Sequence, residues 1–262
     1  MEVGMMDKNG RMSEFILSRH AKRAKPGIEE EMSSKYVGIT KEGEKEAREK
    51  IKKISDIIGN LPQGSVIILG GASKAVHTRS TLELYTDELQ RIFKDKKDVV
   101  FSRPFNPIMP LDALKEISVK MEKTSKAIVQ FPLWIKQFAT FPKQWEEWKK
   151  YFSGLEGASK ENEVVEWIKT KKGPNPNKVA ECFIIGMERE EKFFRKFFPE
   201  NFILFINVSH SGELDAVFTY FANKGEVTKE GFEKIGGMVR ECEFGRMSFL
   251  PQRRIFKYRG KK

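Results

Sequence analysis

The sequence has no apolar run of the roughly 18 residues that a membrane-spanning helix requires. Its first segment, MEVGMMDKNGRMSEF, also lacks the apolar stretch and small-residue cleavage site of a secretory signal peptide. These absences argue against a membrane protein or a secreted protein. We therefore expect a cytoplasmic location and no membrane partner.

Cysteine is nearly absent, with Cys182 and Cys242 as its only occurrences. They lie far apart, without CxxC spacing, and a chain of this size needs neither a disulfide nor a metal site from two cysteines. We interpret both as packing residues.

The composition is that of an ordinary folded protein, with 39% hydrophobic and 32% charged residues among 262. This length predicts one or two domains, and we expect a single domain over 1–262 with an insertion. The net charge of +11 suits an anionic partner, either a phosphorylated molecule or a nucleic acid. No nucleic-acid-binding motif accompanies the basic stretch at 171–178, so we do not expect nucleic acid.

Short apolar runs alternate with segments of helical periodicity along the chain. The predicted strands cover 14–19, 65–71, 98–103 and 201–210, and the predicted helices cover about 40–59, 75–94 and 178–198. Such alternation predicts an α/β fold, a three-layer αβα sandwich with a mainly parallel central sheet.

Two regions depart from this alternation. Prolines and four tryptophans mark about 104–178, where no run is convincing as a strand, and we expect a helical insertion there. Its tryptophans are better explained by packing of that helical region than by a ligand pocket. The tail from Gly236 alternates apolar and polar residues, which predicts a β-rich end with antiparallel strands at a sheet edge.

Histidine occurs three times, as His20, His77 and His210. Each follows the end of a predicted strand or begins the next helix. Ligands of open parallel sheets bind beyond the carboxyl ends of the strands, where loops from distant parts of the chain meet. We therefore expect the three imidazoles to share one pocket.

Five ordered segments carry a family resemblance: SRHAKR at 18–23, GITKEGEKEA at 38–47, GASKAVHTRSTLELY at 71–85, LKEI at 114–117 and VSHSGELDA at 208–216. They resemble, in order, the Arg-His-Gly signature, the Leu-Thr-x-x-Gly helix start, the Ser-Pro-x-x-Arg stretch, the Leu-x-Glu segment and the Val-Ser-His-Gly motif of the histidine phosphatase superfamily. The resemblance implies a metal-independent phosphatase of the phosphoglycerate mutase-like fold, without a cofactor.

The resemblance also implies roles for individual residues. His20 would attack phosphorus and form a phosphohistidine that water hydrolyses. Arg19 and His210 would hold the phosphoryl oxygens. Glu116 would be the proton donor for the leaving oxygen, with Glu213 as the second candidate. The scheme requires no metal, and the three histidines do not have the spacing of common zinc motifs.

One position departs from the family pattern. The phosphate-binding arginine stands four residues after the motif's serine, and counting from Ser73 places His77 there. Arg79 could reach the phosphate only if this segment is still a turn, and Arg103 is an alternative. We therefore name His77, Arg79 and Ser211 as further candidates for binding the substrate phosphate.

Other functions remain open at this stage. A protein of the same fold that binds a phosphorylated ligand without turnover is one alternative, and a phosphomutase is another. Ser209 and Ser211 do not indicate a serine hydrolase, because no Gly-x-Ser-x-Gly elbow surrounds them. The expected substrate is a phosphorylated small molecule or a phosphoprotein.

Overall fold

A computed structural model describes residues 13–25, 27, 31–71, 75–102, 110–120, 125–131, 147, 150–151, 157–249 and 254–259. In this part of the chain a seven-stranded sheet has the order β3-β4-β2-β5-β1-β6-β7. Its strands are β1 (Ser13–Arg19), β2 (Val66–Gly71), β3 (Val99–Ser102), β4 (Lys126–Gln130), β5 (Ile203–Ser209), β6 (Phe244–Phe249) and β7 (Arg254–Lys257).

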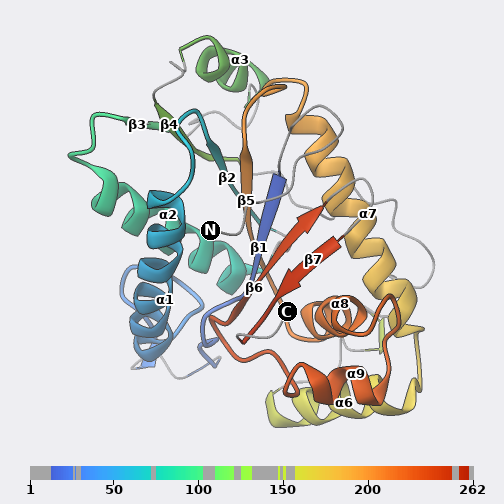
Figure 1. Ribbon diagram of the computed structural model, residues 1–262. Helices are drawn as coiled ribbons and strands as arrows, with labels where there is room; N and C mark the ends of the chain where they lie inside the picture. Colours follow the sequence, from blue (N-terminus) through green and yellow to red (C-terminus); the bar gives the residue numbers. More distant parts are fainter. Residues whose placement is uncertain are drawn as a thin grey trace.

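The sheet is mixed and mostly parallel (Figure 1). The pairs β3–β4, β4–β2, β2–β5 and β5–β1 are parallel, whereas β1–β6 and β6–β7 are antiparallel. In the central pair, Arg19 of β1 lies opposite Ser209 of β5. These two strands therefore end side by side, and the residues that follow them begin at the same edge of the sheet.

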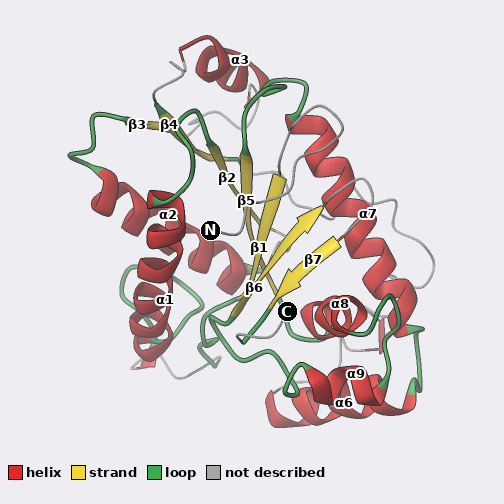
Figure 2. Cartoon of the chain, viewed as in Figure 1, coloured by secondary structure: helices red, strands yellow, loops and turns green. Residues whose placement is uncertain are grey.

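Helices cover both faces of the sheet (Figure 2). One apolar cluster joins α1 (Lys41–Gly59) and α2 (Val76–Phe93) to Ile16, Ile206 and Ile67. The other cluster joins Phe15 and Phe205 to helices on the opposite side. Those helices are α3 (Pro110–Lys120), α6 (Gly157–Thr170), α7 (Pro176–Phe194), α8 (Glu213–Ala222) and α9 (Lys229–Lys234). We call these the α1/α2 face and the α7/α8 face.

The alternation of strand side chains assigns each residue of β1 and β5 to one of these faces. Even-numbered Ile16 and Ser18 face α1 and α2, since Ser18 Oγ lies 3.1 Å from the Tyr85 hydroxyl of α2. Odd-numbered Phe205 and Asn207 face α7, whose Glu190 accepts a hydrogen bond from Asn207 at 3.0 Å. The three-layer sandwich expected from the sequence is thus confirmed.

The start of α1 is fitted closely to the loop after β1. Thr40 caps the helix by accepting the Gly43 N–H at 2.9 Å, and its own N–H donates to the Lys22 carbonyl at 2.9 Å. A Cβ on Gly43 would lie 2.7 Å from the Lys22 nitrogen. Glycine is therefore required here because the helix passes so close to the backbone that follows His20.

The expected strands and helices before residue 103, the helix at α7 and the antiparallel tail of β6 and β7 are confirmed. The expectation of no strand over about 104–178 is wrong, because β4 lies there and pairs with β2 and β3 inside the sheet. Its five residues, KAIVQ, are too few to give a clear alternation.

Packing accounts for the rare residue types that the structure describes. Cys182 and Cys242 are free and buried, as expected. Trp167 is fully buried, and its indole N–H donates to the Pro174 carbonyl at 2.6 Å. Trp134, Trp145 and Trp148 lie outside the described residues.

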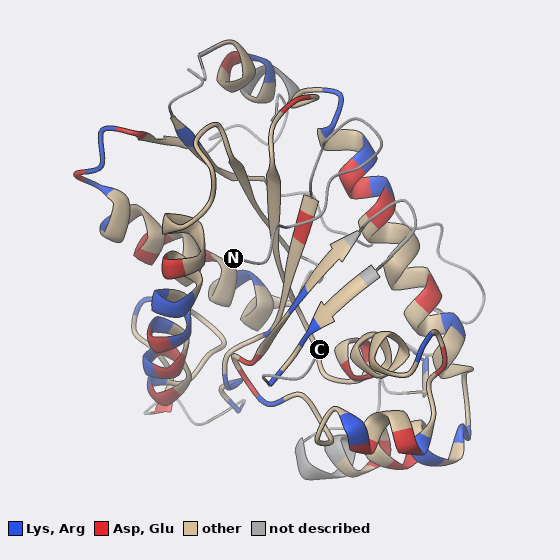
Figure 3. Ribbon diagram, in the orientation of Figure 1, with Lys and Arg blue, Asp and Glu red and all other residues tan. Residues whose placement is uncertain are grey.

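The surface carries charges of both signs, and Figure 3 shows them interspersed along α1 and α7. Among the described residues, no helix is both long enough and apolar enough to cross a membrane.

Candidate active site

Two of the three histidines follow neighbouring strands. His20 comes directly after β1 and His210 directly after β5, and the His20 N–H donates to the Ser209 carbonyl at 2.9 Å. Both positions continue the even-numbered series, so both imidazoles emerge toward the α1/α2 face. His20 is 7% exposed, whereas His210 is half-buried.

The third histidine comes from a helix start. His77 is the second residue of α2, whose N-cap is Ala75, and its side chain is half-buried. The amino end of a helix carries a partial positive charge and unpaired N–H groups, which favour an anion nearby. Helix α2 thus aims both an imidazole and its own amino end at the strand ends.

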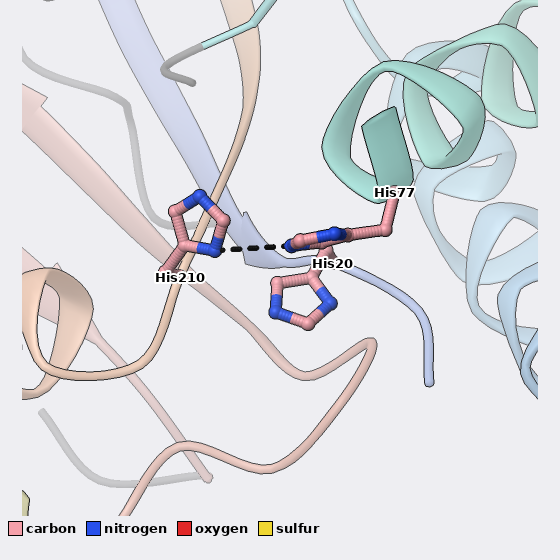
Figure 4. Close-up of side chains that lie close together, drawn as sticks. All are labelled: His20, His77 and His210. Carbon is pink, nitrogen blue, oxygen red and sulfur yellow. Dashed lines mark hydrogen bonds between the residues drawn. The ribbon is translucent and has the colours of Figure 1, made fainter. Parts of the chain in front are cut away.

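The three imidazoles form one cluster (Figure 4). Ring centroids are 4.3 Å apart for His20–His77, and 5.1 Å apart both for His20–His210 and for His77–His210. His77 Nε2 and His210 Nδ1 are hydrogen-bonded at 3.4 Å. The convergence expected from the sequence is therefore present, and it includes every histidine of the chain.

The orientation of the His20 ring is fixed by its own loop. Its Nδ1 lies 2.7 Å from the Ala21 carbonyl, an acceptor that requires a proton on Nδ1. The neutral ring then carries its lone pair on Nε2. His20 consequently presents an unprotonated nitrogen that can attack an electrophile or bind a metal.

Thr81 of α2 links the backbone that follows His20 to the first turn of α2, which carries His77. Its hydroxyl accepts the Ala21 N–H at 3.0 Å and donates to the His77 carbonyl at 2.7 Å. Thr81 is fully buried, so these bonds are shielded from water. Thr81 belongs to the segment 71–85 that carries the family resemblance, and these bonds give it a positioning role.

Arg19 faces the other way. Its side chain belongs to the odd-numbered series of β1 and donates to the Val239 carbonyl at 2.7 Å and to Glu241 at 3.3 Å. Arg19 is 5% exposed. The guanidinium is thus engaged by a segment about 220 residues further along the chain, which the sequence pattern did not anticipate.

Asp215 is a buried residue of this region that sequence reasoning missed. Its carboxylate accepts the N–H groups of Gly212 at 2.6 Å and of Val239 at 2.7 Å. Burial raises the pKa of Asp215 to about 6, against the lowering effect of these bonds and of Arg19. Gly212 has φ +75°, a left-handed conformation suited to glycine. The Gly-x-x-Asp pattern of a helix start was the available signal.

The two glutamates considered as proton donors lie in different parts of the molecule. Glu116 has an exposed side chain on α3, which Figure 1 shows at the upper end of the molecule, far from α8. Glu213 is 1% exposed in the first turn of α8, three residues after His210, and accepts a hydrogen bond from the Ser209 hydroxyl. Ser211 lies half-buried in the turn between them.

The remaining arginine candidates do not join the cluster in the described residues. The helix α2 has already begun at Val76, so Arg79 lies about 200° around its axis from His77, and its side chain is exposed. The turn that would bring Arg79 to the site is therefore not formed. Ser73 and Arg103 lie outside the described residues.

The cluster also has the composition of a metal-binding site. One ring nitrogen from each histidine lies within 4.8 Å of the other two. The zinc-motif spacings that argued against a metal describe ligands on one short segment, whereas these ligands come from three separate parts of the fold. The sequence spacing therefore does not decide this question.

No protein-family model matches the chain, and no curated protein matches it in sequence. A comparison with solved structures does find phosphatases of similar structure. The mycobacterial glucosyl-3-phosphoglycerate phosphatase Rv2419c in complex with VO3 has a TM-score of 0.44 and 10% identity, covering 95% of this chain and 99% of that one.

Two further structures bear phosphatase names. A protein described as an alpha-ribazole-5'-P phosphatase from Escherichia coli has a TM-score of 0.40 and 12% identity, covering 94% and 96% of the two chains. SixA from Agrobacterium tumefaciens, described as a phosphohistidine phosphatase, has a TM-score of 0.22 and 24% identity over 45% of this chain and 68% of that one. All three TM-scores lie below 0.5.

Proposed function

We propose that this protein is a phosphatase of the histidine phosphatase superfamily that hydrolyses a phosphate monoester through a phosphohistidine on His20. The position of His20 carries the proposal. Its Nδ1 donates to the Ala21 carbonyl, which leaves the lone pair of the neutral ring on Nε2, and its ring centroid lies 4.3 Å from that of His77 and 5.1 Å from that of His210. A phosphorylated small molecule or a phosphoprotein is the substrate class that this chemistry serves.

The reaction has two displacements. In the first, the lone pair of His20 Nε2 forms a bond to phosphorus as the bond to the leaving oxygen breaks, and that oxygen takes up a proton. In the second, water attacks phosphorus and gives a proton to the carboxylate that protonated the leaving oxygen, the N–P bond breaks and inorganic phosphate leaves. His210, His77 and the amino end of α2 supply hydrogen bonds and positive potential to the phosphoryl oxygens.

For the leaving-group proton we favour Glu213 over Glu116. Glu213 is buried and follows His210 by three residues, whereas Glu116 is exposed on a helix at the far end of the molecule. A positioned acid typically accelerates such a step by about 10²–10⁴. Ser211, in the same turn as His210, is the proposed hydroxyl contact to the phosphate.

A second candidate function, binding of a phosphorylated ligand without turnover, is supported by the positions of the arginines. Arg19 donates to Val239 and Glu241, and a histidine stands where the resemblance leads us to expect a phosphate-binding arginine. A chain that binds a phosphorylated ligand without turning it over would need no cationic side chain for the transition state. Direct assay of turnover distinguishes this binding protein from the enzyme.

The test is hydrolysis of p-nitrophenyl phosphate with chelator present. The wild type is expected to turn over, and His20→Ala is expected to fall to the uncatalysed rate because no nucleophile remains. Brief incubation with a ³²P-labelled substrate should leave acid-labile, base-stable label on the wild type alone. Cys182→Ala, a buried change on α7, is the matched control and should keep its rate. Binding of phosphate without turnover would support the second candidate.

The role of Glu213 is tested with leaving groups of different basicity. Glu213→Gln is expected to slow hydrolysis of phenyl phosphate by about 10²-fold or more, because phenolate needs a proton. It should slow p-nitrophenyl phosphate much less, because that leaving group departs as the anion. Glu116→Gln is the paired variant. Equal loss with both substrates for Glu213→Gln would assign that residue to the structure of the site and not to proton transfer.

A further inference from the structure

The histidine cluster contains more ligating groups than phosphoryl transfer to one nitrogen requires. His20, His77 and His210 each place a ring nitrogen within 4.8 Å of the others. They come from the ends of β1 and β5 and from the start of α2, so the sheet and a helix fix them independently. Three imidazoles with an open fourth position form the ligand set of a catalytic-type zinc site.

The spacing agrees with a tetrahedral ion. Zinc–nitrogen bonds of about 2.0–2.1 Å place the ligand nitrogens about 3.3–3.4 Å apart. His77 Nε2 and His210 Nδ1 already lie 3.4 Å apart, a long distance for a hydrogen bond but the edge of such a tetrahedron. The pairs that include His20 are within 4.8 Å, so they need to close by at most about 1.5 Å.

The surroundings of His20 match those of a metal ligand. Histidines that bind metals usually donate their other ring N–H to a carbonyl or carboxylate, which fixes the ring and its tautomer. The Ala21 carbonyl serves His20 Nδ1 in this way, at 2.7 Å. Thr81 in turn accepts the Ala21 N–H and donates to the His77 carbonyl, so one hydroxyl ties the backbone beside His20 to the helix that carries His77.

His77 is the residue that completes the set. An arginine at this position would be permanently cationic and unable to donate a lone pair, whereas a neutral imidazole is a common ligand for zinc, copper and nickel. We propose that His20, His77 and His210 together bind one divalent transition-metal ion, with zinc as the reference, and that this ion competes with the phosphoryl group for His20 Nε2. The competition rests on the proposed function, whereas metal binding does not.

Metal binding is measured first, without any assay of turnover. Tag-free protein is treated with chelator, freed of it, and titrated with Zn²⁺ by calorimetry and with Co²⁺ by visible absorbance. We expect one ion per chain and the intense absorption of tetrahedral cobalt. His77→Gln and His77→Arg should each weaken binding at least tenfold, while Cys182→Ala should bind as the wild type does. Near-UV circular dichroism shows which variants are folded.

The competition is measured second, with each variant compared to its own metal-free rate. Stoichiometric Zn²⁺ should suppress p-nitrophenyl phosphate turnover by the wild type at least tenfold, and chelator should restore it. In His77→Arg the added zinc should have no such effect. The unequal response would tie the inhibition to this site.

Distinct outcomes separate the two proposals. Absence of one-to-one zinc binding, or binding that both His77 variants retain, would overturn the metal site. Turnover that rises with zinc and disappears with chelator would overturn the competition and assign the ion a catalytic role. A wild type that binds zinc through His77 but never hydrolyses p-nitrophenyl phosphate would refute the proposed phosphatase activity and support the metal site.

Discussion

The two faces of the sheet differ in what surrounds their polar side chains. At the carboxyl ends of β1 and β5, the α1/α2 face presents His20 and His210 beside His77, and His77 Nε2 is hydrogen-bonded to His210 Nδ1. The α7/α8 face instead buries Arg19 and the carboxyl groups of Glu190 and Asp215. Arg19 and His20, neighbours in the chain, therefore take part in different arrangements, one among buried polar groups and one in the imidazole cluster.

Strand register therefore selects which side chain is available for chemistry. Arg19 and His20 are neighbours in sequence, but alternation sends the guanidinium to Val239 and Glu241 and the imidazole to the cluster. Proximity in a motif is thus insufficient evidence that two residues act on the same substrate. Substitutions on one face at a time test this difference, and their expected effects on the free energy of unfolding decrease from Glu190 to Thr81 to Glu241.

The largest effect is expected on the α7/α8 face, at Glu190. Burial raises its pKa to about 8, so the folded protein retains a proton that the unfolded chain releases near 4.5. The stability associated with the protonated group is present at low pH and is lost as pH rises from about 4.5 toward 8. The expected loss between pH 5 and 7.5 is about 3 kcal/mol.

Glu190→Gln should remove most of this pH dependence, because the amide stays neutral and can still pair with Asn207. Urea unfolding at pH 5 and pH 7.5 measures it, with Glu188→Gln, an exposed residue of the same helix, as the control. Asp215, whose pKa is raised to about 6, should leave a smaller residual slope of the same sign at lower pH. An unchanged slope in Glu190→Gln would contradict the assignment.

An intermediate effect is expected on the α1/α2 face, at Thr81. Thr81→Val removes the acceptor of the buried Ala21 N–H and should cost about 1–3 kcal/mol of stability. It should also reduce kcat, since the backbone beside His20 loses its bond to the helix that carries His77. Thr86→Val is the matched control, because Thr86 is equally buried on α2 but bonds only to the Leu82 carbonyl among the contacts described. Equal losses in both variants would remove the positioning role.

The smallest effect is expected at the partly exposed ion pair of Arg19 and Glu241, 3.3 Å apart. Glu241→Gln should change stability by only about 0.2–1 kcal/mol. It should also tighten inhibition by inorganic phosphate up to about fivefold, because the negative charge beside Arg19, the residue before His20, is lost. Glu233→Gln, an exposed change of the same charge on α9, controls for net charge. Identical inhibition constants for the two variants would show that the charge of Glu241 does not act on bound phosphate.

Local patterns were sufficient for most of the fold. The apolar run before His20 and the helical spacing of Ala47, Ile51, Ile54 and Ile58 correspond to β1 and to the buried side of α1. The strand β4 was missed because five residues between two irregular segments give no readable period. Its position between β2 and β3 depends on partners distant in sequence.

The site was predictable only in part. The histidines could be placed together because they follow strands that end at the same edge of the sheet. The hydrogen bonds of Arg19 could not be predicted, because its partners Val239 and Glu241 lie about 220 residues away in the chain. Asp215, which accepts the Val239 N–H, had only the local Gly-x-x-Asp pattern at the start of α8 as a signal, because its partner belongs to a later segment of the chain.

The three rings of the cluster are also the only imidazoles in the chain. Histidine is therefore a native isotopic label for this site: selective ¹⁵N labelling of the unmodified protein yields resonances from these side chains alone. The nitrogen shifts report which ring nitrogen carries a proton, so the tautomer that the Ala21 carbonyl imposes on His20 can be read in solution without any substitution. Every ligand that enters the site will move signals that have no background from elsewhere in the protein.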